Sequence, residues 1–238
     1  PGARTLQDRM IEEALARSDL EVSQEVLRLT RLFIEHLKNV NEKTNLTAIT
    51  DDESIGTRHL QDSWILYRYI PEQASVIDIG SGAGFPGLAL KIVRPDLDIT
   101  LLDSVKKKVD FLRSALNLLA FDRACAIQGR AEELGRDPAY RDHFDVAVAR
   151  AVTALPALLE LSLPLVRPGG LFIAMKGQDD EISESERVLG LLKGKLKDVV
   201  RYQLPDTDQP RSLVIIQKLE RTPSRYPRRM AVIKKNPL

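Results

Sequence analysis

From residue 75 onward, short apolar runs alternate with helix-like segments, and this alternation limits the possible fold more than any other feature. The strand-like runs cover residues 75–79, 98–103, 124–128, 145–149 and 170–175. Helices are predicted between and after them, at residues 85–93, 105–119, 130–135, 154–165 and 179–192. Such alternation predicts a parallel sheet with helices on both faces.

Two further strands are predicted near the end, at residues 198–204 and 212–218, joined by the short turn Pro205 to Pro210. The turn is too short for a crossover helix, so this pair must be antiparallel. Five parallel strands closed by an antiparallel hairpin resemble the α/β, seven-stranded, mostly parallel sheet of class I S-adenosylmethionine-dependent methyltransferases, and differ from dehydrogenases.

The first 70 residues have helical periodicity, which predicts an N-terminal helical extension. Asp51 or Asp52 can cap its third helix, and Pro71 ends it. We therefore expect three regions, a helical cap at 1–71, a catalytic domain at 72–220 and an extended basic tail at 221–238.

Composition points to a cytoplasmic protein without structural metal. Its 238 residues include one cysteine and three scattered histidines, so an internal disulfide and a multi-cysteine metal site are excluded. No apolar run is long enough for a membrane span or typical of a secretory signal. The net charge is only +1, yet residues 193–238 hold twelve basic and four acidic side chains. That asymmetry suggests a polyanionic partner, or else a solvated tail.

The most specific motif is the glycine-rich turn after the first strand, Asp78-Ile79-Gly80-Ser81-Gly82-Ala83-Gly84-Phe85-Pro86-Gly87. Glycines allow close backbone approach to a ligand and positive φ angles. The spacing also satisfies a dinucleotide fingerprint. Asp78 favours the sulfonium cofactor, because an acid would repel a pyrophosphate but attract the ammonium group of S-adenosylmethionine.

Three further places in the sheet pattern are candidates for ligand contacts. Asp103 ends the second strand, where an acid can accept hydrogen bonds from ribose hydroxyls or cap the next helix. Ala131 and Glu132 follow the third strand and either contact an adenine edge or simply begin a helix. Arg150 lies just beyond the fourth strand, which makes it a site residue or a rim salt bridge.

Other polar residues have two possible roles each. His59, Asp62 and Ser63 lie on one helical face, where they fix the N-terminal helices or form a pocket wall. Lys106, Lys107 and Lys108 open a helix, an unfavourable place for cations, so they contact RNA phosphate or form a solvated face.

These residues together resemble the RsmG (GidB) family of bacterial 16S ribosomal RNA guanine-N7 methyltransferases. The resemblance runs from about residue 40 to Leu238 and includes Asn45-Leu46-Thr47, His59-Leu60-x-Asp62-Ser63, the glycine loop, Arg130-Ala131-Glu132-Glu133, Lys176-Gly177 and Thr222-Pro223-x-x-Tyr226-Pro227-Arg228-Arg229. The sequence departs from the family at Ala231 and Ile233, where a glycine and a proline are usual.

The resemblance implies S-adenosylmethionine as cofactor and a guanine in the 530 loop of 16S rRNA, free or in a small-subunit particle, as substrate. It implies cofactor contacts at Gly80, Phe85, Ala131, Glu132 and Arg150, to which the residue pattern adds Asp78, Gly82 and Asp103. For RNA we expect contacts from Lys107, Lys108, Lys176, Arg211, Arg228 and Arg229, with Tyr226 stacking on a base.

Guanine N7 has a free lone pair, so transfer needs alignment and no general base. We therefore expect no acid–base residue and no metal, with Arg150, His59 and Lys176 positioning the substrate in a monomeric enzyme. Two alternatives stay open, a nicotinamide-dependent oxidoreductase and a non-catalytic RNA-binding assembly factor.

Overall fold

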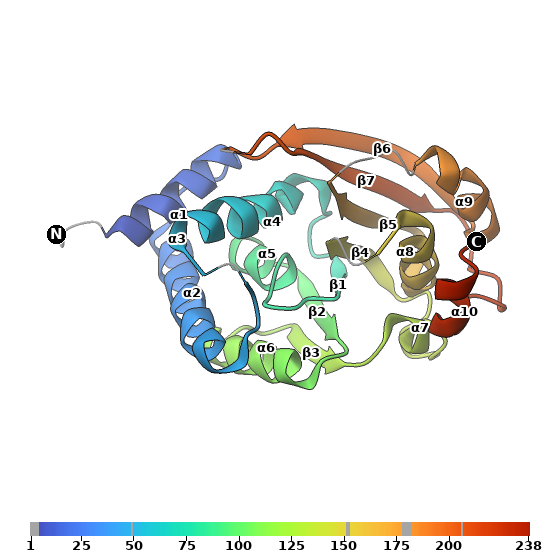
Figure 1. Ribbon diagram of the computed structural model, residues 1–238, viewed down its shortest axis with the longest axis horizontal. Coiled ribbons are helices and arrows are strands. Elements are labelled where there is room, and N and C mark those ends of the chain that lie inside the picture. The colour runs from blue at the N-terminus through green and yellow to red at the C-terminus, as the bar shows by residue number, and fades with distance from the viewer. Residues whose placement is uncertain (1–4, 49, 151–152, 178–181, 206) are drawn as a thin grey trace. The chain divides into compact units, whose positions relative to one another are not determined.

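The computed structural model describes residues 5–48, 50–150, 153–177, 182–205 and 207–238. Within these ranges seven strands form one mixed sheet in the order β3-β2-β1-β4-β5-β7-β6 (Figure 1). The strands are β1 Ser75–Ile79, β2 Asp98–Asp103, β3 Ala124–Gln128, β4 Phe144–Arg150, β5 Val166–Lys176, β6 Gly194–Gln203 and β7 Pro210–Lys218. β2 and β3, β1 and β4, and β4 and β5 pair in parallel, whereas β7 is antiparallel to both β5 and β6. The expected fold class is confirmed.

The helices of the described ranges follow the expected alternation. They are α1 Leu6–Arg17, α2 Gln24–Thr44, α3 Asp52–Ser54, α4 Asp62–Trp64, α5 Gly87–Val93, α6 Lys106–Leu119, α7 Ala131–Leu134, α8 Leu155–Ser162, α9 Glu186–Leu192 and α10 Met230–Lys235. A π-helix, η1, spans Ile55–Gln61, and 3-10 turns span η2 Ile65–Tyr69, η3 Leu163–Leu165 and η4 Ser183–Ser185. Part of the expected helix 179–192 lies outside the described residues.

One expectation was wrong, because the tail is not extended throughout. α10 spans Met230–Lys235 and includes Ala231 and Ile233, where the resemblance implies a glycine and a proline. Both substituted residues support a helix better than the residues they replace. Ile233 is fully buried, so packing of one apolar side chain fixes the helix in place.

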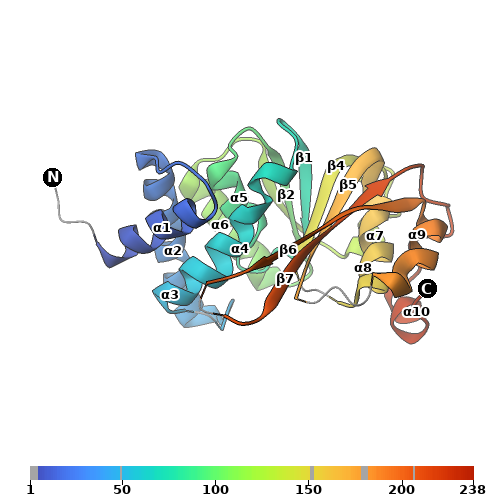
Figure 2. The same ribbon diagram turned by 90° about the horizontal axis from the view of Figure 1, so that it is seen from above.

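By its internal contacts the chain divides into two compact units, the first of residues 1–73 and 81–128 and the second of residues 74–80 and 129–238. In the first unit α2 packs against α6 (Figure 1), and α5 and α6 contact β2. In the second, α8 contacts β5 and α9 contacts β6, while β6 and β7 run as a pair of long twisted strands (Figure 2). The functional boundaries at residues 71 and 220 stay a prediction.

The third N-terminal helical segment is composite, and this shapes the first unit. Asp51 caps it, as expected, by accepting a hydrogen bond from the Ser54 backbone N–H. α3, η1, α4 and η2 then follow without a break to Tyr69. Fully buried Trp64 anchors the segment by donating from Nε1 to the Ala89 carbonyl at 2.9 Å.

Candidate cofactor and RNA-binding site

The glycine-rich loop depends on backbone angles that favour glycine. Gly80, Gly82 and Gly84 have φ angles of +75°, +56° and +99°, in or near the left-handed region where a Cβ atom causes strain. In the first unit, the Ser81 N–H donates to the Leu102 carbonyl at 2.9 Å. This main-chain hydrogen bond ties the loop to the end of β2.

Asp103 holds the same loop through its side chain. Its Oδ2 accepts from the Gly82 N–H and its Oδ1 from the Val105 N–H, each at 2.9 Å. The carboxylate is 7% exposed and has no ion pair with any described residue. Since a carboxylate offers about four acceptor positions, two remain for hydroxyl donors. Asp103 thus both orders the start of α6 and retains the capacity to bind a ligand, so the two expected roles are compatible.

Aromatic rings enclose Phe85, the loop's only aromatic residue. The His59 ring stacks on it with 4.4 Å between centroids and 9° between planes. Phe33 of α2 lies at 5.3 Å, and a Cβ atom at Gly84 would come 3.0 Å from Phe33 Cζ. The shape of the loop is therefore fitted to Phe33. Sequence reasoning missed this role, because Phe33 belongs to an ordinary apolar stripe of α2 and no local signal links it to residue 84.

The aromatic row continues away from the loop. Phe33 stacks on Phe111 of α6, and the His36 ring also stacks on Phe111, with 5.4 Å between centroids. Partial burial lowers the pKa of His36, and its Nε2 lies 2.7 Å from Ser114 Oγ. α2 and α6 are thus joined to the loop by consecutive ring contacts.

His59 reaches Phe85 from the π-helix η1. A π-turn widens the helix and often occurs at functional sites. Ser63 Oγ donates to the His59 carbonyl at 2.5 Å, and His59, Asp62 and Ser63 are all buried. His59 therefore packs on Phe85 of the glycine loop, and its expected role as a wall of the RNA or cofactor pocket stays a prediction.

In the second unit, three predicted residues lie on adjacent strands. Asp78, fully buried near the end of β1, pairs in register with Val148 of β4. Arg150 ends β4, and Lys176 ends β5 and donates from Nζ to the Thr153 carbonyl at 3.1 Å. The carboxyl ends of parallel strands are where sheets of this class bind ligands. Ala131 and Glu132, 8% and 9% exposed, begin α7 in the same unit.

In the tail, Arg228 and Tyr226, which were predicted to contact RNA, have roles in the fold. Arg228 donates to the carboxylate of Glu160 from its backbone N–H, Nε and Nη2 at 2.8–2.9 Å. The Glu160 side chain is fully buried. Tyr226 is only 5% exposed, which leaves no face for a base to stack on. Arg141 adds bonds to the Thr222 and Tyr226 carbonyls at 2.7 and 2.8 Å. The RNA contacts expected of Tyr226 and Arg228 are therefore replaced by roles in the fold.

The remaining cations that were predicted to contact RNA differ in whether the fold already uses their donor groups. Lys107 donates to the Thr44 carbonyl at 2.7 Å, so it caps the carboxyl end of α2. Arg211 on β7 is half-buried, with its Nε unbonded among the described residues. Lys108 and Arg229 form no ion pair with any described residue, and Arg229 is exposed. Cationic surface in the tail therefore centres on Arg229 and α10, with Lys108 a separate candidate in the first unit.

The described residues lack the features of two other classes of protein. No helix among them is long and apolar enough to cross a membrane. They also contain no cluster of three histidine, cysteine or acidic side chains that could hold a metal ion.

Solved structures with the same fold are methyltransferases. A chain in a complex between the Haloferax volcanii Trm112 methyltransferase activator and a putative methyltransferase has a TM-score of 0.58 at 14% identity, covering 77% of this chain and 98% of that one. The AdoMet complex of M. jannaschii TYW2 has a TM-score of 0.54 at 14% identity, covering 68% and 76%. The fold is that of class I S-adenosylmethionine-dependent methyltransferases.

The sequence comparisons narrow this class to one family. The family model described as GidB, rRNA small subunit methyltransferase G, matches residues 27–209. The ribosomal RNA small subunit methyltransferase G of Acetivibrio thermocellus is 45% identical, covering 85% of this chain and 84% of that protein. That of Clostridium novyi is 40% identical over 96% of both chains. The chain belongs to the rRNA small subunit methyltransferase G family.

Proposed function

We propose that this protein transfers the methyl group of S-adenosylmethionine to N7 of a guanine in the 530 loop of 16S rRNA. Membership of the rRNA small subunit methyltransferase G family carries the proposal. The glycine loop supports it independently, because its positive φ angles and the buried Asp103 carboxylate suit a nucleoside ligand.

Cofactor contacts are proposed residue by residue. In the first unit, Gly82, Phe85 and Asp103 belong to or hold the glycine loop, and Asp103 keeps acceptor positions for ribose hydroxyls. In the second unit, the family resemblance implies contacts from Gly80, Ala131, Glu132 and Arg150, and the residue pattern adds Asp78. Asp78 and Arg150 lie near or at the ends of the parallel strands β1 and β4, and Gly80, Ala131 and Glu132 follow β1 and β3. Ligands bind at these strand ends in sheets of this class.

Methyl transfer to guanine N7 needs no general acid or base. S-adenosylmethionine, when bound, supplies an electrophilic methyl carbon on a sulfonium sulfur. Guanine N7 carries a free lone pair, so the protein would not need to remove a proton before transfer; the N7–methyl bond would form as the bond from the methyl carbon to sulfur breaks. Alignment of this kind contributes about 7–11 kcal/mol to a barrier. Arg150 stays protonated and donates hydrogen bonds, for example to guanine O6 beside N7, and it cannot act as a base.

We assign RNA binding to four of the predicted cations. Arg229 is exposed, Lys176 lies at the end of β5, and Lys108 and Arg211 retain donor groups. Together with the excess of positive charge in residues 193–238, they suit a phosphate backbone. The partner we propose is 16S rRNA, free or within a small-subunit particle, bound by a monomer in the cytoplasm.

Methyl transfer in vitro tests this function against its alternatives. The protein is incubated with labelled S-adenosylmethionine and either deproteinised 16S rRNA or small-subunit particles. We expect 7-methylguanosine in at least one substrate and measurable calorimetric binding of the cofactor. Binding of NAD instead would support an oxidoreductase. RNA binding without cofactor binding or methyl transfer would support an assembly factor.

A further inference from the structure

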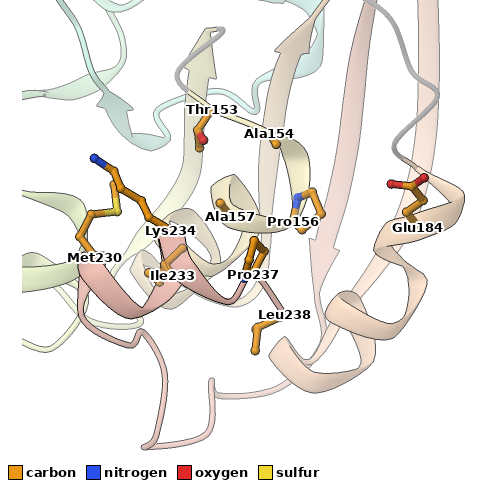
Figure 3. Close-up of a pocket in the computed structure, with 10 residues that line it drawn as sticks. All are labelled: Thr153, Ala154, Pro156, Ala157, Glu184, Met230, Ile233, Lys234, Pro237 and Leu238. Atoms are coloured by element: carbon orange, nitrogen blue, oxygen red, sulfur yellow. The ribbon is translucent and has the colours of Figure 1, made fainter.

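A pocket of about 520 Å³ opens in the second unit between the start of α8 and helix α10 (Figure 3). Thr153, three residues beyond the end of β4, forms part of its rim. The same residue accepts the hydrogen bond from Lys176 at the end of β5. The pocket therefore begins at the carboxyl edge of the sheet, where folds of this class bind ligands.

The walls of the pocket are apolar in the middle and charged at two places. Pro156 and Ala157 of α8 face Met230 and Ile233 of α10. Figure 3 shows the Lys234 amine near Met230 and the Glu184 carboxylate on the other side of the start of α8. Neither Lys234 nor Glu184 forms an ion pair with any described residue. A ligand that satisfies both must be flat or apolar in its body, anionic at one end and a hydrogen-bond donor at the other.

A nucleotide has this distribution of groups, and other ligands match it less well. Its phosphate suits Lys234, its base N–H donors suit the Glu184 carboxylate, and its base faces suit apolar walls. A free anion would use Lys234 but gain nothing from the apolar walls and be repelled by Glu184. An apolar side chain of a protein partner would use neither charge. The volume falls within the range of about 300–1,000 Å³ that is usual for small-ligand pockets.

We propose that this pocket binds one unpaired nucleotide of the RNA substrate, adjacent in sequence to the guanine that is methylated. The proposal rests on the proposed function, since it needs an RNA substrate whose reacting base lies at the sheet edge near Arg150. Exposed Arg229 and Lys235 are next in sequence to the lining residues Met230 and Lys234, and they add positive charge that suits a phosphate backbone. The pocket thus selects an unpaired segment, because a base within a duplex cannot enter it.

Filling the pocket tests the proposal. Ala157→Phe places a ring between the apolar walls without changing charge, and Ala231→Phe makes the same change at an exposed position of α10 outside the lining. We expect Ala157→Phe to raise the KM for rRNA about tenfold, in line with the loss of one stacked base, with kcat and cofactor Kd unchanged. Ala231→Phe should match the wild type. An unchanged KM in a folded Ala157→Phe protein would overturn the proposal.

A second measurement identifies the occupant and guards against misfolding. RNA fragments that contain the target guanine carry an abasic residue on its 5′ or its 3′ side. For the wild type, one of these two abasic RNAs should raise the Kd about tenfold, because it lacks the base that the pocket binds. The same RNA should change the Kd of Ala157→Phe by less than about twofold. Equal effects on both proteins, or none on either, would contradict the assignment. Lys234→Glu, at an exposed position, should likewise weaken RNA binding and leave the melting temperature unchanged.

The two experiments distinguish failure of the pocket assignment from failure of the proposed function. If the wild type transfers no methyl group to rRNA, the proposed function fails. If it does and Ala157→Phe behaves like the wild type, only the pocket assignment fails.

Discussion

Asp103 at the glycine loop and Glu160 beneath the tail are both buried carboxylates, yet their surroundings differ. Glu160 is fully buried and accepts four hydrogen bonds from Arg228, which neutralises its charge. Asp103 accepts only two backbone N–H bonds and has no ion pair with a described residue. A buried acid with a dedicated arginine stabilises the fold, whereas one that keeps free acceptor positions is available to a ligand. The five predictions below test this contrast, starting with the largest expected effect.

Arg228→Ala should destabilise the protein by about 3–5 kcal/mol, because it leaves the Glu160 carboxylate buried without a partner. Denaturant unfolding measures the change. Arg229→Ala is the matched control, since the neighbouring arginine is exposed and forms no ion pair with a described residue. Equal stability of the two variants would show that the Arg228–Glu160 pair does not hold the tail.

Asp103→Ala should weaken S-adenosylmethionine binding by about 1.5–3 kcal/mol, the usual loss for a hydrogen bond to a charged group. Calorimetry gives the dissociation constant. Asp103→Asn retains an acceptor oxygen for the Gly82 N–H and should lose less affinity. If both variants bind the cofactor like the wild type, Asp103 serves only to order the loop and the start of α6.

Gly84→Ala should cost about 1–3 kcal/mol of stability and also weaken cofactor binding, since it strains a positive φ and brings Cβ against Phe33. Phe33→Leu removes the ring that the new Cβ atom meets. The double variant should therefore be more stable than the sum of the single losses predicts. Strict additivity would show that Phe33 does not set the shape of the loop.

Arg229→Ala should leave cofactor affinity unchanged and alter only RNA binding. For a single-stranded target, loss of one phosphate contact reduces the slope of log affinity against log salt by about 0.7. Filter binding over a range of salt concentrations measures this slope. A wild-type slope in Arg229→Ala would place the RNA contact on other cations.

The smallest expected effect is on the pH dependence of methyl transfer. Single-turnover rates at saturating cofactor and RNA should show no essential base between about pH 6 and 9, because N7 needs no deprotonation and arginine stays protonated. His59→Ala loosens the support of Phe85 and should lower the rate without changing the shape of the profile. A limb near pH 6.5 that disappears in this variant would identify His59 as a general base.

The sequence predicted local features well because strand periodicity, glycine spacing and helix caps are encoded within a few residues. β1, β2 and β3 begin and end where the apolar runs do, and Asp51 caps the third helix. The expectations for Tyr226 and Arg228 depended on long-range packing. A tail arginine looks the same in sequence whether it meets RNA or a buried acid 68 residues earlier.

One signal of that pairing was nevertheless present. Glu160 is a lone acid in the otherwise uncharged segment Leu155–Ser162, and a buried charge of this kind requires a partner. No comparable signal marked Phe33 or the π-turn that presents His59, because both depend on how separate helices meet. The pocket between α8 and α10 was also unpredictable, because its lining comes from two helices that are far apart in the sequence.

Mapping of 7-methylguanosine in 16S rRNA tests the central claim most directly. The measurement compares rRNA from cells that carry the gene for this protein with rRNA from cells that lack it, by chemical cleavage at 7-methylguanosine and primer extension. We predict one modified guanine in the 530 loop that disappears in the deletion strain and returns with the wild-type gene. Its return with Asp103→Ala should be reduced. An identical 7-methylguanosine pattern in the two strains would contradict the proposed function.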